Sequence, residues 1–291
     1  MNKLWKLMIF IGLLTGPMAV AQEDLLSILD EESDVSSFAV EAIFKGTRLI
    51  NGHTVETRRQ HNLDFLISHR FGRINGGAYE FFGLDQANVR LGFDYGLTDH
   101  INLGIGRSSF EKTLDGYFKY AFLHQATGSK SFPFSATLFS SVAIKTLKER
   151  EFEDQVMFTD RLSYTHQVLI ARKFSPSFSM QLMPSYVHFN TIYPDENRND
   201  LYIAGVGGRM KLTPRVSLNV EYYYQLQKKQ SGLKDALAIG FDIETGGHVF
   251  QLHLTNAQSM IEKGFLTETT GDFFNGDIHF GFNISRTFQL K

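Results

Sequence analysis

Apolar and polar residues alternate through the chain from residue 62 to residue 290, in short segments separated by turn signals. Ile278, Phe280 and Phe282, for example, alternate with His279 and Gly281. Successive side chains of a β-strand point to opposite faces, so this period of two predicts strands with one apolar and one polar face. In an exported chain, such a pattern is typical of a transmembrane β-barrel.

The first 21 residues have the pattern of a secretory signal peptide. Lys3 and Lys6 precede an apolar run over residues 7–14, and small residues lead to a predicted cleavage site after Ala21. No later stretch approaches the roughly 18 uninterrupted apolar residues that a membrane-spanning helix needs. We therefore expect three parts: the signal peptide (1–21), an N-terminal tail and possible plug segment (22–61), and the β-barrel (62–291).

The composition argues against several classes of protein. The chain has no cysteine, which rules out a disulfide framework and a lipid-bearing N-terminal cysteine. Its formal net charge is −2, and clustered Lys and Arg are what nucleic-acid binding requires, so no nucleic-acid partner is predicted. The 27 Phe and 11 Tyr residues suit a sheet-rich barrel with aromatic girdles.

The turn signals set the predicted strand number. Tight turns are expected near Asp99, near Ser129 and at residues 175–177, 213–215 and 245–247, each between two alternating segments. Five hairpins with a first and a last strand give an antiparallel up-and-down barrel of about twelve strands. Longer polar connections alternate with the turns and are expected to face outside, which leaves both termini in the periplasm of an outer-membrane protein.

Strand parity also predicts which side chains face the lumen. The predicted lumen-lining residues carry charges of both signs or are histidines: Asp64, Arg90, Asp94, Lys119, Lys145, Glu221, Asp242, His253 and His279. Such a lining can leave a narrow aqueous path, or its charges can pair and close it. His253, His279 and Asp242 lie on neighbouring strands but carry no metal-binding motif, so neither a metal nor a cofactor is predicted.

Several segments resemble a family of secreted bacterial β-barrel proteins of unknown function. The resemblance covers most of the mature chain and is strongest over residues 44–120, including the runs 44–55, 64–73, 83–96 and 104–113. It implies an outer-membrane barrel without an assigned activity. Expected partners are outer-membrane lipid and lipopolysaccharide, and the barrel assembly machinery, for which Phe288 near the C-terminus is the expected signal.

Ser140 and His166 are the weak candidates for catalysis. Parity places both on the lipid-facing side of two neighbouring strands, equally far from the hairpin midpoint near Glu153, so that they are expected side by side. Outer-membrane phospholipases use a lipid-facing Ser and His. The sequence shows neither an oxyanion donor nor a third catalytic group, and an ordinary interfacial pair is the preferred interpretation.

Three functions remain open, and an enzyme is the least favoured. The first is a passive or selective channel for small solutes, with Arg90, Asp94, Lys119 and Glu221 as determinants of what passes. The second is a closed structural or docking barrel that binds another envelope protein. The third is a lipid-modifying enzyme. Residues 38–57 separate the first two, since a plug there would block a pore.

Overall fold

The computed structural model describes residues 37–147, 157–190, 199–246 and 248–290. The predicted signal peptide and residues 22–36 of the predicted tail lie outside them. The barrel strands are β2 (Asn62–Arg73), β3 (Ala87–Gly96), β4 (Ile101–Ser108), β5 (Leu114–Leu123), β7 (Ser135–Ile144), β8 (Leu162–Lys173), β9 (Phe178–Phe189), β10 (Asp200–Lys211), β11 (Val216–Gln225), β12 (Ala236–Thr245), β13 (His248–Thr255) and β14 (His279–Gln289).

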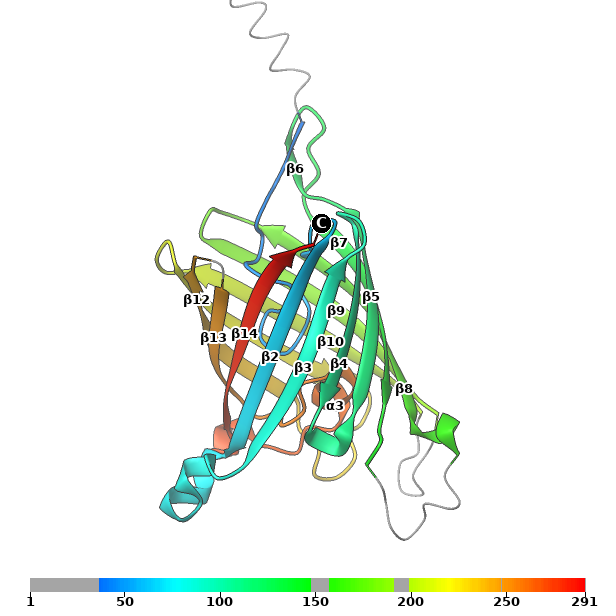
Figure 1. The fold of residues 1–291 in the computed structure, drawn as a ribbon, viewed down its shortest axis with the longest axis vertical. Coiled ribbons are helices and arrows are strands. Elements are labelled where there is room, and N and C mark those ends of the chain that lie inside the picture. Colours follow the sequence, from blue (N-terminus) through cyan, green and yellow to red (C-terminus); the bar gives the residue numbers. More distant parts are fainter. Residues whose placement is uncertain (1–36, 148–156, 191–198, 247, 291) are drawn as a thin grey trace, which may run out of the picture. The chain divides into compact units, whose positions relative to one another are not determined.

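These twelve strands form one closed antiparallel barrel (Figure 1). Each strand pairs with its neighbours along the chain, and β14 pairs with β2 to complete the ring. The predicted fold class and strand number are confirmed. Short turns join the strands at one end, which we call the turn end, apart from the connection between β5 and β7. Most of the connections at the other end, which we call the loop end, are longer.

Short helices lie in the loop-end connections. They are η1 (Ile74–Gly83), η2 (Phe110–Lys112), η4 (Phe158–Arg161), α3 (Glu262–Thr267) and η5 (Phe273–Asn275). No helix in the described part of the chain is long and apolar enough to cross a membrane.

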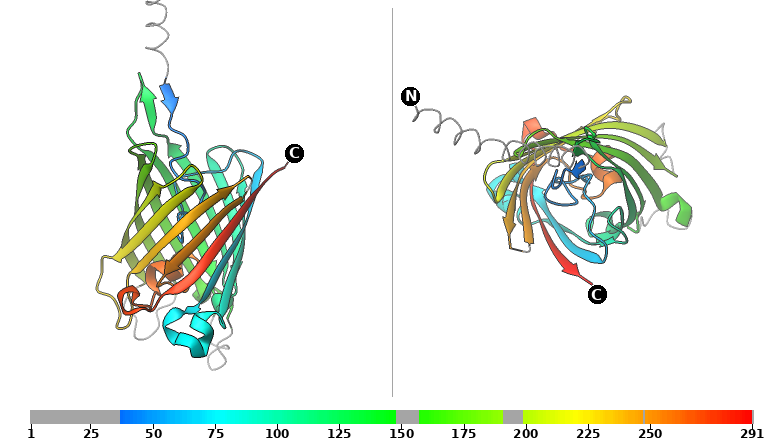
Figure 2. Two further views of the ribbon diagram at one scale, coloured as in Figure 1. Left: turned by 90° about the vertical axis from the view of Figure 1, so that its left-hand side faces the viewer. Right: turned by 90° about the horizontal axis from the view of Figure 1, so that it is seen from above.

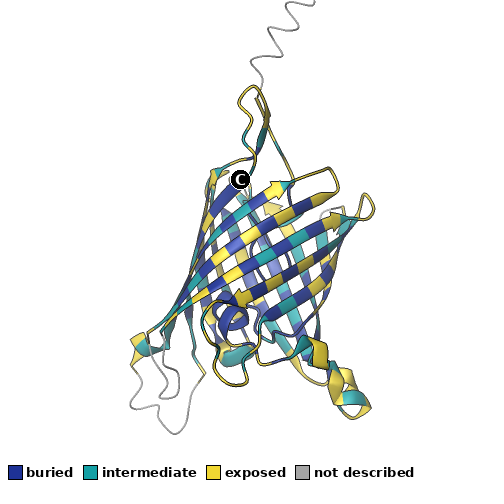
Figure 3. Cartoon of the chain, turned by 180° about the vertical axis from the view of Figure 1, so that it is seen from behind, coloured by how far each residue is buried: buried dark blue, intermediate teal, exposed yellow. Residues whose placement is uncertain are grey.

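Burial alternates along the strands as the period of two requires (Figure 3). In β3, the outward Leu91 and Phe93 are 46% and 44% exposed, whereas the inward Arg90 and Asp94 are 1% and 0% exposed. The barrel therefore presents apolar side chains outside and polar side chains inside, the arrangement of a barrel that lies in lipid.

A separate two-stranded sheet pairs β1 (Ser37–Ala39) with β6 (Ala126–Gly128). Ser37 lies opposite Gly128, and the N–H of Val40 donates to the carbonyl of Gln125 at 2.7 Å. This sheet forms a compact unit of its own with residues 125–133. The connection near Ser129 is thus longer than a tight turn, because three of its residues pair with the N-terminal strand.

Candidate functional site

Residues 43–57, which we call the luminal segment, run inside the barrel (Figure 2, right). The segment folds back on itself at Asn51-Gly52, where the N–H of Leu49 donates to the carbonyl of Gly52 at 2.8 Å. Leu49 is 1% exposed and His53 is fully buried. The lumen is therefore occupied by the chain that precedes the first barrel strand.

Two charged side chains of the wall bind the backbone of the luminal segment. The Glu221 carboxylate on β11 accepts the N–H groups of Asn51 at 2.8 Å and Gly52 at 3.2 Å. The Lys119 ammonium on β5 donates to the carbonyls of Thr54 at 2.8 Å and Glu56 at 2.6 Å. Hydrogen bonds to charged groups contribute more to stability than neutral ones do, so these two residues hold the segment against the wall.

Amide side chains of the wall also bind the backbone of the luminal segment. Gln181 on β9 donates to the carbonyl of His53 at 2.7 Å and accepts the N–H of Val55 at 2.8 Å. Asn283 donates to the carbonyl of Ile50 at 3.0 Å. The segment pairs only part of its own backbone, and side chains of the wall bind these further groups.

A second segment fills the lumen from the loop end. Residues 256–275 carry α3, whose Glu262 carboxylate accepts a hydrogen bond from Arg48 of the luminal segment at 2.8 Å and lies 3.4 Å from His53. Burial raises the pKa of the Glu262 carboxyl, and the Arg48 guanidinium opposes that rise. Lys263 bonds Glu111 of η2 at 2.8 Å, which ties α3 to a neighbouring loop.

Arg70 on β2 joins both filling segments. Its guanidinium donates to the carbonyls of Ala257 at 2.6 Å and Ser259 at 3.1 Å, and to the side-chain oxygen of Asn51 at 2.7 Å. One buried cation thus fixes the luminal segment, the loop and the wall together.

One side of the lumen is apolar. A buried cluster joins Leu49 and Val55 of the luminal segment and Phe265 of α3 to inward residues of the wall that include Leu169 and Met183. The alternation of apolar and polar residues did not predict this cluster. The sequence did contain a signal for it, the apolar run Val168-Leu169-Ile170. A strand with apolar surroundings on both faces lacks the polar residue at every second position.

The predicted lumen residues are buried, apart from Lys145, and each of them makes a hydrogen bond or an ion pair. Asp94 accepts from Thr47 at 3.0 Å, and Asp64 pairs with Arg58 at 2.5 Å. Their burial in a filled lumen means that they do not line a water path in this state.

The remaining predicted lumen residues bond to the wall or lie at its rim. Arg90 pairs with Asp115, Asp242 accepts from Gln251, His253 contacts Arg70, and His279 contacts the carbonyl of Phe71. His253, His279 and Asp242 form no metal-binding cluster, and none is found among the described residues. Lys145 follows the last residue of β7 and lies at the loop end, where its ammonium is 3.2 Å from Glu111.

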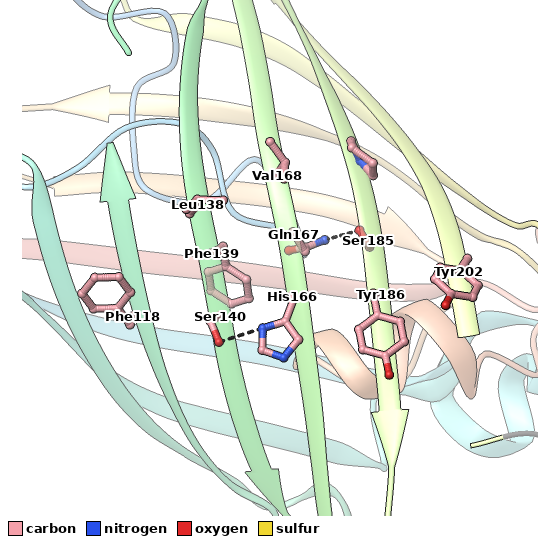
Figure 4. A pocket seen from close by; sticks show the side chains of 11 residues that line it. Phe118, Leu138, Phe139, Ser140, His166, Gln167, Val168, Ser185, Tyr186 and Tyr202 are labelled. Carbon is pink, nitrogen blue, oxygen red and sulfur yellow. Dashed lines mark hydrogen bonds between the residues drawn. The ribbon is translucent and has the colours of Figure 1, made fainter. Parts of the chain in front are cut away.

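Ser140 and His166 lie opposite each other on β7 and β8, outside the barrel, with Oγ and Nδ1 2.9 Å apart (Figure 4). The backbone around Ser140 is paired on both sides, which leaves no free N–H for an oxyanion hole. No carboxylate bonded to His166 is found in the described parts of the chain. The pair thus lacks two components of a hydrolase site.

Replacing Ser140 by Ala should leave acyl-ester hydrolysis at its background rate, because the wild-type pair lacks the groups that stabilise an acyl-transfer transition state. The measurement is fatty-acid release from phospholipid vesicles that contain the refolded protein. Release by the wild type that disappears in Ser140→Ala would establish the enzyme instead.

Comparison with known proteins agrees with this architecture. A family model described as "Membrane bound beta barrel domain (DUF5777)" matches residues 44–288, and no curated protein matches the chain. Among solved structures, the NanC porin superposes with a TM-score of 0.51 at 9% identity, covering 78% of this chain and 100% of that one. The KdgM porin gives a TM-score of 0.46 at 7% identity, covering 79% and 99%. The resemblance to a barrel family is confirmed, and the NanC likeness shows the shared fold.

Proposed function

The chain belongs to the membrane-bound β-barrel family DUF5777, and we propose that it is an outer-membrane channel for small solutes that its own luminal segment keeps closed. The short turns and both termini then face the periplasm. A porin with the same fold makes a channel the first function to test.

The polar attachment of the luminal segment carries the proposal. Glu221, Lys119 and Gln181 bind its backbone through hydrogen bonds that water can replace once the segment leaves. The same side chains would then line the emptied lumen as the polar interior of a channel. The test is single-channel conductance in a planar bilayer, with the mature protein beside a variant that lacks residues 22–60.

Replacing Gly52 by Ala should make the closed protein leak. A Cβ at this position would lie 1.9 Å from the hydroxyl oxygen of Tyr223, which is 1% exposed and has little room to move. The turn must shift and weaken its bonds to Glu221, which is expected to raise the frequency of opening about tenfold or more. Bursts of conductance in the planar bilayer measure this.

Gly46→Ala is the matched control within the luminal segment. The nearest atom to its added Cβ is 3.7 Å away, an ordinary contact, so this variant should stay closed. If Gly52→Ala is as silent as Gly46→Ala, the turn does not hold the channel shut.

A closed docking barrel is the second candidate, and the apolar cluster in the lumen favours it. Leu169, Met183 and Phe265 pack there around Leu49, as in the core of a permanently filled protein. In that case the lumen serves stability, and the N-terminal part or the loops would bind another envelope protein. A truncated protein that folds but does not conduct would support this function.

A further inference from the structure

A single row of side chains crosses five strands on the outside of the barrel. Phe118, Ser140, His166, Tyr186 and Tyr202 are direct neighbours in register across β5, β7, β8, β9 and β10. Ser140 and His166 in this row are bonded to each other, and aromatic rings flank them. Cross-strand neighbours on one face lie within contact distance, so the row is one continuous surface.

This row borders a hollow of about 470 Å³ on the outer surface (Figure 4). Its lining includes Ser140, Val168 and Pro184, whose side chains are shorter than the neighbouring aromatic ones. No lining residue of the hollow is charged. The outside of this barrel faces lipid, so the molecules that reach the hollow are those of the bilayer.

The second ring nitrogen of His166, Nε2, is a polar atom at this hollow. In the tautomer in which the Ser140 hydroxyl donates to Nδ1, the ring proton is on Nε2. No hydrogen bond to Nε2 is found within the part of the chain that the structure describes. The Tyr186 hydroxyl donates to Asp200 at 2.5 Å and is already satisfied. A donor that faces lipid without an acceptor is costly, so His166 needs one from the membrane.

We propose that this hollow binds one diacyl phospholipid, with the Nε2–H of His166 donating to an acyl-ester carbonyl of the lipid. The ester carbonyl is a neutral acceptor, which matches a site without charged side chains. The acyl chains then pack on the apolar lining, against Phe118 and Leu138 on one side of His166 and against Tyr202 on the other. Ser140 is a positioning residue, because it fixes the ring orientation and the tautomer of His166.

Native mass spectrometry of the full-length protein tests this site with two lipid probes. One is a diacyl phosphatidylethanolamine, and the other is its dialkyl ether analogue, which has the same headgroup and chain lengths but no ester carbonyl. We expect the wild type to retain one diester molecule about tenfold more tightly than the diether, the worth of one hydrogen bond in lipid. His166→Phe should abolish this difference and Ser140→Ala should reduce it.

His69→Phe is the matched control, since His69 also lies outside the barrel but stacks on Phe282 of β14, away from the hollow. It should keep the tenfold preference for the diester. Equal retention of diester and diether by the wild type would overturn the proposal, as would a His166→Phe variant that behaves as the wild type. Neither result depends on whether the lumen conducts.

Discussion

Removal of residues 22–60 is expected to turn a silent protein into one with steady ohmic conductance in a planar bilayer. The deletion takes away the luminal segment and leaves β2, which begins at Asn62, intact. It also removes Arg48, the partner of Glu262, so residues 256–275 lose a contact that holds them in the lumen and are expected to move aside. Twelve strands lie between the filled eight-stranded barrels and the open barrels of sixteen or more, so we expect the current to rise at least roughly tenfold. Lys119 and Glu221 lose their partners in the segment and become the charges that face the solution.

Ion selectivity provides the internal check on this result. In the truncated protein, Glu221→Gln should lower the preference for cations and Lys119→Met should raise it, whereas both charges are covered in the intact protein. Resistance of the truncated barrel to protease and its altered mobility in unheated gels would show that it has folded. A folded truncated protein without conductance would contradict the channel and favour the docking barrel.

Replacing Arg90 by Leu is expected to cost about 3–5 kcal/mol of unfolding free energy, because it leaves a buried carboxylate unpaired. The Arg90 guanidinium binds Asp115 through two hydrogen bonds, at 2.9 Å and 2.5 Å, and Arg90 is 1% exposed. It also lies across Gly106, where an added Cβ would come within 2.3 Å of it. Urea unfolding of the refolded protein in lipid vesicles measures the loss.

The double variant Arg90→Leu/Asp115→Leu separates the charge effect from the packing effect. It removes both charges and should recover most of the stability, because no buried charge is then left unpaired. A double variant as unstable as Arg90→Leu alone would show that the packing of Arg90 over Gly106 accounts for most of the lost stability. In that case Arg90 stabilises the wall and does not determine what passes.

The barrel could be predicted from the sequence because the signals for strands and turns lie within a few residues of one another. The period of two predicted which side chains face in and which face out. The hairpin midpoint near Glu153 predicted that Ser140 lies beside His166, as it does in the structure. The filling of the lumen could not be predicted this way. Arg48 and Glu262 are 214 residues apart in sequence, and Asn51 and Glu221 are 170 apart. No local signal joins such pairs, although parity did place Glu221 on the inner face.

The position of the luminal segment next to β2 also bears on the assembly of the barrel. The ring closes where the last strand, β14, pairs with the first barrel strand, β2. The luminal segment is covalently joined to β2, so it enters the lumen beside this seam. If it is in place when β14 meets β2, Glu221 and Lys119 have their partners as soon as the wall closes. Residues 43–57 then serve as a tethered ligand of the barrel that encloses them.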